Sequence, residues 1–188
     1  MPYQMSLDDQ LAALASAGIE VRAGTPRADL ARNFDENEIE ARPWECLYDV
    51  GEHSDHLFDL ALKGIETTDD RDAYAGVVRT FSQISRGTFP ASEITGNVDF
   101  AANTAFVEFT LDEKRHRIDT VVQGEWLEAD VFAQLDALLR DRSYGWGFYG
   151  AVAGEGLLVL ATDRAGYLRL RAAGAPFAWL GRAMQTRR

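Results

Sequence analysis

The stretch TAFVEFTL (Thr104–Leu111) carries the clearest structural pattern in the chain. Phe106, Val107, Glu108 and Phe109 alternate in the manner of a strand that has one face on a core and the other in water. Two further strands are predicted beside it, near 94–100 and 115–122. Because the links between these three strands are short, we expect neighbouring antiparallel pairs.

Helical spacing of apolar residues flanks these strands on both sides. Before them, Thr68 and the acids at 69, 70 and 72 are typical of a helix start, because carboxylates suit the positive end of the helix dipole. We expect this helix to end at Gly87. After the strands, the pattern predicts a helix over about 128–142, strands at 146–152 and 156–162 joined by a tight turn, and a short helix from Asp163.

The N-terminal third is harder to interpret. Ser6 is a suitable cap for a helix running to about Ala17, with Gly18 at its end. Residues 19–43 are polar and ambiguous, with a short helix around Asp29 and a loop as the expectation. Trp44–Val50 and His56–Leu62 have the composition of strands separated by a polar turn.

These elements predict one α+β domain over residues 1–188. We expect a mainly antiparallel sheet of about five to seven strands, with three or four helices packed mostly on one face. Residues 1–66 form the acidic N-terminal part of this domain, 67–180 its core, and 181–188 a disordered tail.

Charge and cysteine content limit the possible partners and the compartment. The net charge of −11 argues against duplex DNA and anionic lipid, so we expect neither a nucleic acid nor a membrane as partner. Cys46 is the only cysteine, which fits a reducing cytosol. Residues 1–10 lack the basic and apolar runs of a signal peptide, and a cytoplasmic location is expected.

The negative charge is concentrated in the first two thirds of the chain. Residues 1–113 hold 22 acids and 8 bases, whereas residues 114–188 hold 8 acids and 11 bases. Within 35–72 there are 13 acids against 3 bases. This region is either a solvated face that aids solubility or a surface that steers a basic protein towards itself. The candidate partner-binding residues are Asp35, Glu36, Glu38, Glu40, Glu45, Asp49, Glu52, Asp55 and Asp59.

An aromatic segment near the C-terminus offers a second candidate surface. Tyr144, Trp146 and Phe148 are expected on one face of a strand, either as a stacking platform for a ligand or as core under a helix. The glycines at 145, 147 and 150 match a dinucleotide-binding spacing. That motif needs a strand before it and a helix after it, and here the order is reversed, so no nucleotide cofactor is predicted.

The sequence gives little support for a metal site or a catalytic nucleophile. Glu52, His53, Asp55, His56 and Asp59 are possible metal ligands, but the stretch is predicted as a turn, with no second cluster to complete a site. Cys46 has an acid beside it, which raises a thiol pKa and disfavours a nucleophile. We therefore predict no catalytic residue, no metal and no cofactor. Whether the aromatic segment serves an enzyme stays open.

The layout of residues 69–180 resembles a known class of proteins. A helix, a strand triplet ending in Gly124-Glu125-Trp126-Leu127, the helix Val131–Leu139, a hairpin, then Leu168–Gly174 and Phe177 is similar to small acidic bacterial immunity proteins. The element order is also similar to the secretion-chaperone-like fold, from which the N-terminal 60 or so residues and the short last helix depart. Both resemblances imply a non-catalytic protein-binding role; an immunity protein would neutralise a basic toxin.

Overall fold

Six helices and seven strands make up the described part of the chain. The computed structural model describes residues 4–21, 23–30, 34–47, 60–64, 70–123, 127–153 and 156–180. The helices are α1 Leu7–Ser16, α2 Arg27–Leu30, α3 Glu36–Ala41, α5 Ala73–Ile84, α6 Ala129–Arg142 and α7 Arg164–Ala172. The strands are β1 Leu60–Gly64, β2 Ser92–Asp99, β3 Thr104–Leu111, β4 Lys114–Val121, β5 Trp146–Ala153, β6 Gly156–Asp163 and β7 Ala178–Trp179.

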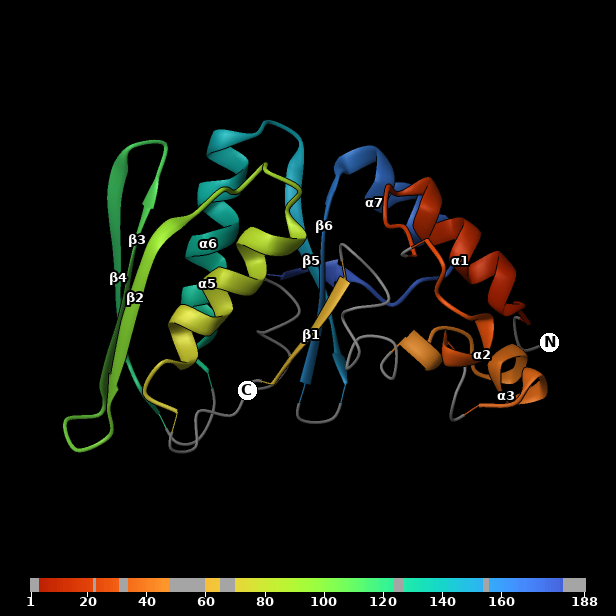
Figure 1. Ribbon diagram of the computed structural model, residues 1–188, viewed down its shortest axis with the longest axis horizontal. Helices are drawn as coiled ribbons and strands as arrows, with labels where there is room; N and C mark the ends of the chain where they lie inside the picture. The colour runs from red at the N-terminus through yellow and green to blue at the C-terminus, as the bar shows by residue number, and fades with distance from the viewer. Residues whose placement is uncertain are drawn as a thin grey trace.

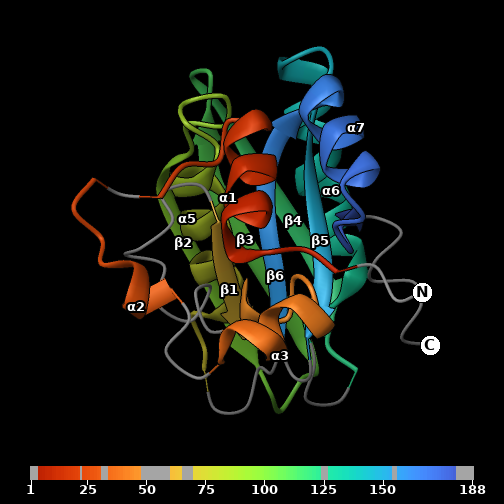
Figure 2. The same cartoon turned by 90° about the vertical axis from the view of Figure 1, so that its right-hand side faces the viewer.

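The strands form two separate antiparallel sheets. One is the meander β2-β3-β4, and the other has the order β1-β6-β5-β7. The expected α+β class and antiparallel pairing are confirmed. The expected single sheet with helices mostly on one face is wrong, because α5 and α6 lie between the two sheets and α1, α3 and α7 lie beyond the second one (Figure 1). Figure 2 shows α1 and α3 in front of the four-stranded sheet.

The central strand β6 explains this layered arrangement. Leu157, Val159 and Ala161 belong to one buried cluster, shared with α5, α6 and the inner face of β2-β3-β4. Leu158 and Leu160 point the other way, into a second cluster with α1, α3 and α7. Since alternate side chains of a strand point to opposite faces, a run that is apolar at every position needs cover on both. Helices supply that cover on each side.

Several element predictions are confirmed. Strand β3 spans the predicted residues 104–111, and β2 and β4 lie within two residues of their expected bounds. The side chain of Ser6 caps α1 by accepting a hydrogen bond from the Asp9 N–H at 3.2 Å. The predicted helix before the strands is present as α5, but it begins only at Ala73 and ends at Ile84, so Asp70 and Asp72 precede it and do not lie in its first turn; Thr68 and Asp69 lie outside the described residues.

The predicted strand Trp44–Val50 is wrong over its described part, Trp44–Leu47. Trp44 has a positive φ of 77° and lies in a turn, and its N–H donates to the buried Gln10 Oε1 at 2.8 Å. A side chain of α1 therefore takes the place of a strand partner. The sequence interpretation also missed α3, where Asp35 and Glu38 form a reciprocal capping box.

A tight joint connects α7 to the end of α1. Gly166 lies so close to Ala17 that a Cβ atom there would be 3.2 Å from the Ala17 Cα and closer still to the Thr162 hydroxyl. Thr162 Oγ1 donates to the Ala17 carbonyl at 2.8 Å in buried surroundings. The absence of a side chain at position 166 thus permits both the helix contact and this hydrogen bond.

We expect Gly166→Ala to destabilise the protein by about 1–3 kcal/mol, because the added methyl overpacks a backbone contact that cannot shift cheaply. Urea unfolding followed by circular dichroism measures this. Ala165→Ser is the matched control: it adds one atom at the neighbouring, exposed position of the same helix. Equal stability of the two variants would contradict the role of the joint.

Candidate functional site

A pocket of about 750 Å³ lies at one end of the β5-β6 hairpin. Two other pockets, of about 250 Å³ beside β4 and α6 and about 120 Å³ beside α1 and α3, are smaller. The larger volume falls within the range typical of small-molecule sites. Its lining is mostly aromatic and consists of Arg140, Tyr144, Gly145, Trp146, Tyr149, Arg164, Tyr167, Leu168 and Trp179, here called the aromatic pocket.

Sheet register brings these side chains together. Trp146 pairs with Asp163, which places the first turn of α7 beside the start of β5. Tyr149 pairs with Trp179 of the two-residue strand β7. The rings of Tyr149 and Tyr167 stack with their centroids 4.2 Å apart and an angle of 12° between them. Burial raises the pKa of Tyr149 to about 12, so its hydroxyl keeps its proton at neutral pH.

One buried carboxylate holds the wall of the pocket in place. Asp136 of α6 is only 2% exposed, and its Oδ1 accepts the Phe148 N–H at 3.0 Å. Its Oδ2 lies 3.1 Å from Arg140 Nη2, and its side chain also hydrogen-bonds Trp179. Arg140 in turn lies over the Trp179 ring, 4.4 Å from the centroid. Asp136 thereby positions the edge of β5 at Phe148, the guanidinium of Arg140 and the ring of Trp179.

A glycine makes this convergence possible. A Cβ at Gly147 would lie 3.2 Å from Trp179 Nε1, tighter than ordinary van der Waals contact, and 3.4 Å from Asp136 Oδ1, at the lower limit of ordinary contact. The glycines at 145, 147 and 150 follow α6 and run into β5, the order that the sequence analysis expected. Gly147 is therefore the residue that lets Trp179 pack closely against β5.

The three aromatic residues singled out from the sequence divide into two groups. Tyr144 precedes β5 and is fully exposed at the pocket, while Trp146 is half-buried with the Arg86 guanidinium 5.2 Å from its ring centroid. Phe148 is fully buried and packs 4.3 Å from the Phe81 ring, so it belongs to the core and does not line the pocket. Tyr144 therefore does not share a strand face with the other two.

Sequence reasoning missed the rest of the lining. The side chain of Tyr149 points to the opposite face of β5 from Phe148, so an alternation that selects Trp146 and Phe148 does not include it. Tyr167 and Trp179 come from separate elements, and β7 is too short to show a periodic pattern.

The acidic candidates are only partly described. Asp49, Glu52, Asp55 and Asp59 lie outside the described residues, as do His53 and His56. Asp35 and Glu38 cap α3, and Arg42 pairs with both Glu38, at 3.5 Å, and Glu45, at 2.9 Å. Glu36 and Glu40 are exposed, and the charge of Glu36 contributes to raising the pKa of Arg27.

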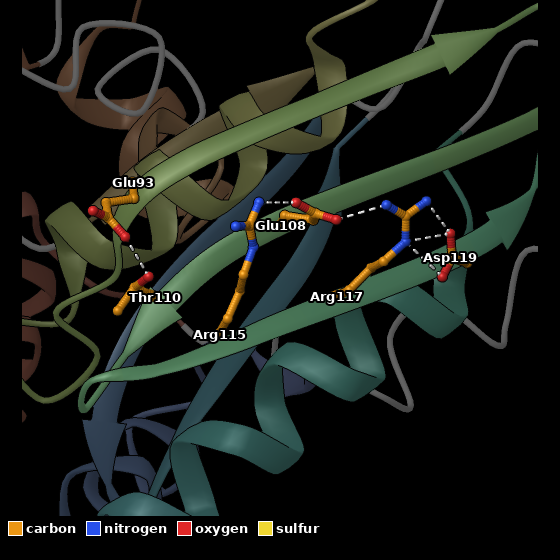
Figure 3. A network of polar contacts seen from close by, with 6 residues as sticks. All are labelled: Glu93, Glu108, Thr110, Arg115, Arg117 and Asp119. Atoms are coloured by element: carbon orange, nitrogen blue, oxygen red, sulfur yellow. Dashed lines mark hydrogen bonds and ion pairs between the residues drawn. The ribbon is translucent and has the colours of Figure 1, made fainter.

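The outer face of β2-β3-β4 carries a charge network that is internally balanced. Glu108 pairs with Arg115 and with Arg117, the latter at 2.6 Å, and Arg117 reaches Asp119 at 2.8 Å (Figure 3). Hydrogen bonds from both arginines lower the pKa of Glu108. Because each arginine already faces a carboxylate, this face is not a free basic patch, whereas His116 turns inward and stacks on Phe109.

The described residues contain neither a metal-binding cluster nor a helix that could span a membrane. Nowhere among them do three or more His, Cys, Asp or Glu side chains gather into a possible metal site. None of the described helices is long and apolar enough to cross a membrane. Cys46 is buried and lies 3.6 Å from Gln10 Oε1.

Comparisons with known proteins give no assignment. No protein-family model matches the chain, and searches of curated proteins and of solved structures found no significant match. The resemblances to immunity proteins and to secretion chaperones therefore receive no support from these comparisons.

The surroundings of Asp136 predict a specific dependence of stability on pH. Burial raises the pKa of this carboxyl above its ordinary 3.8, although Phe148, Arg140 and Trp179 each act to lower it. The folded protein therefore holds this proton more tightly than the unfolded chain, and the resulting stability is present at low pH and lost as pH rises through the raised pKa. In Asp136→Asn this loss disappears.

The measurement is the free energy of unfolding in urea from pH 4 to pH 7 for both proteins. We expect the wild type to lose stability relative to Asp136→Asn as pH rises. Asp141→Asn, an exposed position of the same helix, serves as control and should follow the wild type. A difference between wild type and Asp136→Asn that stays constant with pH would contradict the assigned cause.

Proposed function

We propose that this protein is a small-molecule-binding protein whose site is the aromatic pocket. The single observation that carries the proposal is the convergence of five aromatic rings around about 750 Å³ of space. Such rings offer flat apolar surface at little conformational cost, and they stack well on planar groups. The ligand class expected from this lining contains an aromatic ring.

The exposure of the lining supports the same proposal. Tyr144 is 102% exposed, Leu168 55% and Trp179 42%, and all three border the pocket. Large apolar side chains left in water at one place are typical of a binding surface. The buried Asp136 below them adds rigidity, because it fixes Arg140 and Trp179 before any ligand arrives.

The neutral probe 1-naphthylacetamide tests the proposal. We expect binding with a Kd of about 1 mM or tighter, from the free energy that drug-sized ligands gain per atom. Tyr144→Ala should weaken it about two- to tenfold through lost stacking, without loss of stability since the ring is fully exposed. Changes in the indole N–H resonances of Trp146 and Trp179 report the binding.

Phe100→Ala is the matched control, because it also truncates an exposed aromatic ring but lies outside the pocket. Its affinity for the probe should equal that of the wild type. Failure of the wild type to bind, or equal weakening in the two variants, would overturn the proposed site.

A second candidate function is the binding of a basic protein, of the kind that an immunity-type protein would neutralise. It is favoured by the position of Glu36 and Glu40, which are exposed on α3 at the far end of the molecule from the balanced network on β2-β3-β4 (Figure 1). Exposed carboxylates attract cationic groups, which speeds association with a basic surface, although Glu36 also interacts electrostatically with Arg27.

For this candidate we expect low-salt capture of a basic protein that 0.5 M salt abolishes, because exposed charges are screened. Glu36→Gln combined with Glu40→Gln should reduce the captured amount. Arg115→Gln combined with Arg117→Gln is the control and should not reduce it. Capture that is insensitive to salt, or equally lowered by both double variants, speaks against the acidic surface.

A further inference from the structure

The charged groups of the aromatic pocket are all of one sign. In a chain with 30 acidic and 19 basic residues, the described residues of the lining include Arg140 and Arg164 and no acid. A cationic ligand would meet two guanidinium groups in the lining, whereas the nearest carboxylates, Asp136 and Asp163, lie behind it and act electrostatically on Tyr149. The lining therefore discriminates by charge as well as by shape.

The two arginines are not equivalent. Arg140 already forms an ion pair with the buried Asp136 at 3.1 Å and lies over the Trp179 ring, so its charge is compensated and its position fixed. Arg164 is exposed at the pocket and makes no ion pair among the described residues. Its guanidinium is thus the cation that remains available to a ligand.

The backbone around Arg164 adds only weakly to the preference of the pocket for an anion. Arg164 is the first residue of α7, so the positive end of the helix dipole lies at the same rim. Asp163 caps that end, its carboxylate accepting the Gly166 N–H at 2.6 Å, and offsets the dipole. Selection of an anion consequently depends on the Arg164 side chain.

We propose that the aromatic pocket is selective for planar aromatic carboxylates, with the ring among the aromatic side chains and the carboxylate on the guanidinium of Arg164. This assignment rests on the proposed small-molecule function and adds the charge of the ligand. A guanidinium matches a carboxylate through two parallel N–H···O bonds, which an amide or an amine cannot accept in the same way.

The test compares three probes that share one ring system, namely 1-naphthylacetate, 1-naphthylacetamide and 1-naphthylmethylamine. We expect the acetate to bind about fivefold more tightly than the amide, the size of a favourable exposed ion pair, and the amine to bind most weakly. Arg164→Gln should bring acetate and amide to equal affinity. Arg171→Gln, an exposed arginine of the same helix outside the pocket, should leave the preference unchanged.

The outcomes separate the two proposals. Equal binding of acetate and amide by the wild type, or tightest binding of the amine, overturns the charge selection while the aromatic pocket stands. A preference for acetate that survives in Arg164→Gln overturns the role of Arg164. Absence of binding by all three probes overturns the small-molecule function itself. A preference that also weakens with added salt supports an ion pair as its cause.

Discussion

The burial of β6 on both faces is the constraint on which the rest of the structure depends. Leu157 to Ala161 are all fully buried, with side chains alternating between two clusters. One sheet with helices on a single side would leave half of this run in water. Helices α5 and α6 cover one face of β6, and the N-terminal helices together with α7 cover the other. The second sheet, β2-β3-β4, then covers the outer side of α5 and α6 (Figure 1).

The aromatic pocket lies at the β7 edge of the four-stranded sheet. Within the described residues β7 pairs with β5 at two positions, and the N–H of Phe148 at this edge has Asp136 as its acceptor. The same carboxylate also orders Arg140 and Trp179. The hydrogen bond that the Phe148 N–H requires is therefore coupled to the arrangement of the rings around the pocket. Because a buried acceptor without its donor is costly, stability and site geometry depend on the same group.

Local patterns predicted local structure well and the site poorly. The alternation in Thr104–Leu111 and the helical spacing around Phe132 depend on the neighbours of each residue in the chain, and both elements appear as expected. The prediction at Trp44 failed because Trp44, Cys46 and Leu47 have the composition of a strand, whereas the turn at Trp44 is held by Gln10, far away in sequence. Of the pocket, Tyr144 and Trp146 lay in one conspicuous segment. Tyr167 and Trp179 reach it only through strand register, which no local pattern encodes.

The hydrogen bond from Thr162 to the carbonyl of Ala17 spans 145 residues of sequence, and its consequence concerns the order of folding. During synthesis α1 leaves the ribosome long before β6, so of its partners only those as early in the chain as α3 and Trp44 are available at first. Contacts of such sequence separation close large loops and slow the folding of a domain. The buried cluster that contains Leu14 also contains Leu158 and Leu160, so it cannot be complete until the C-terminal hairpin has been synthesised.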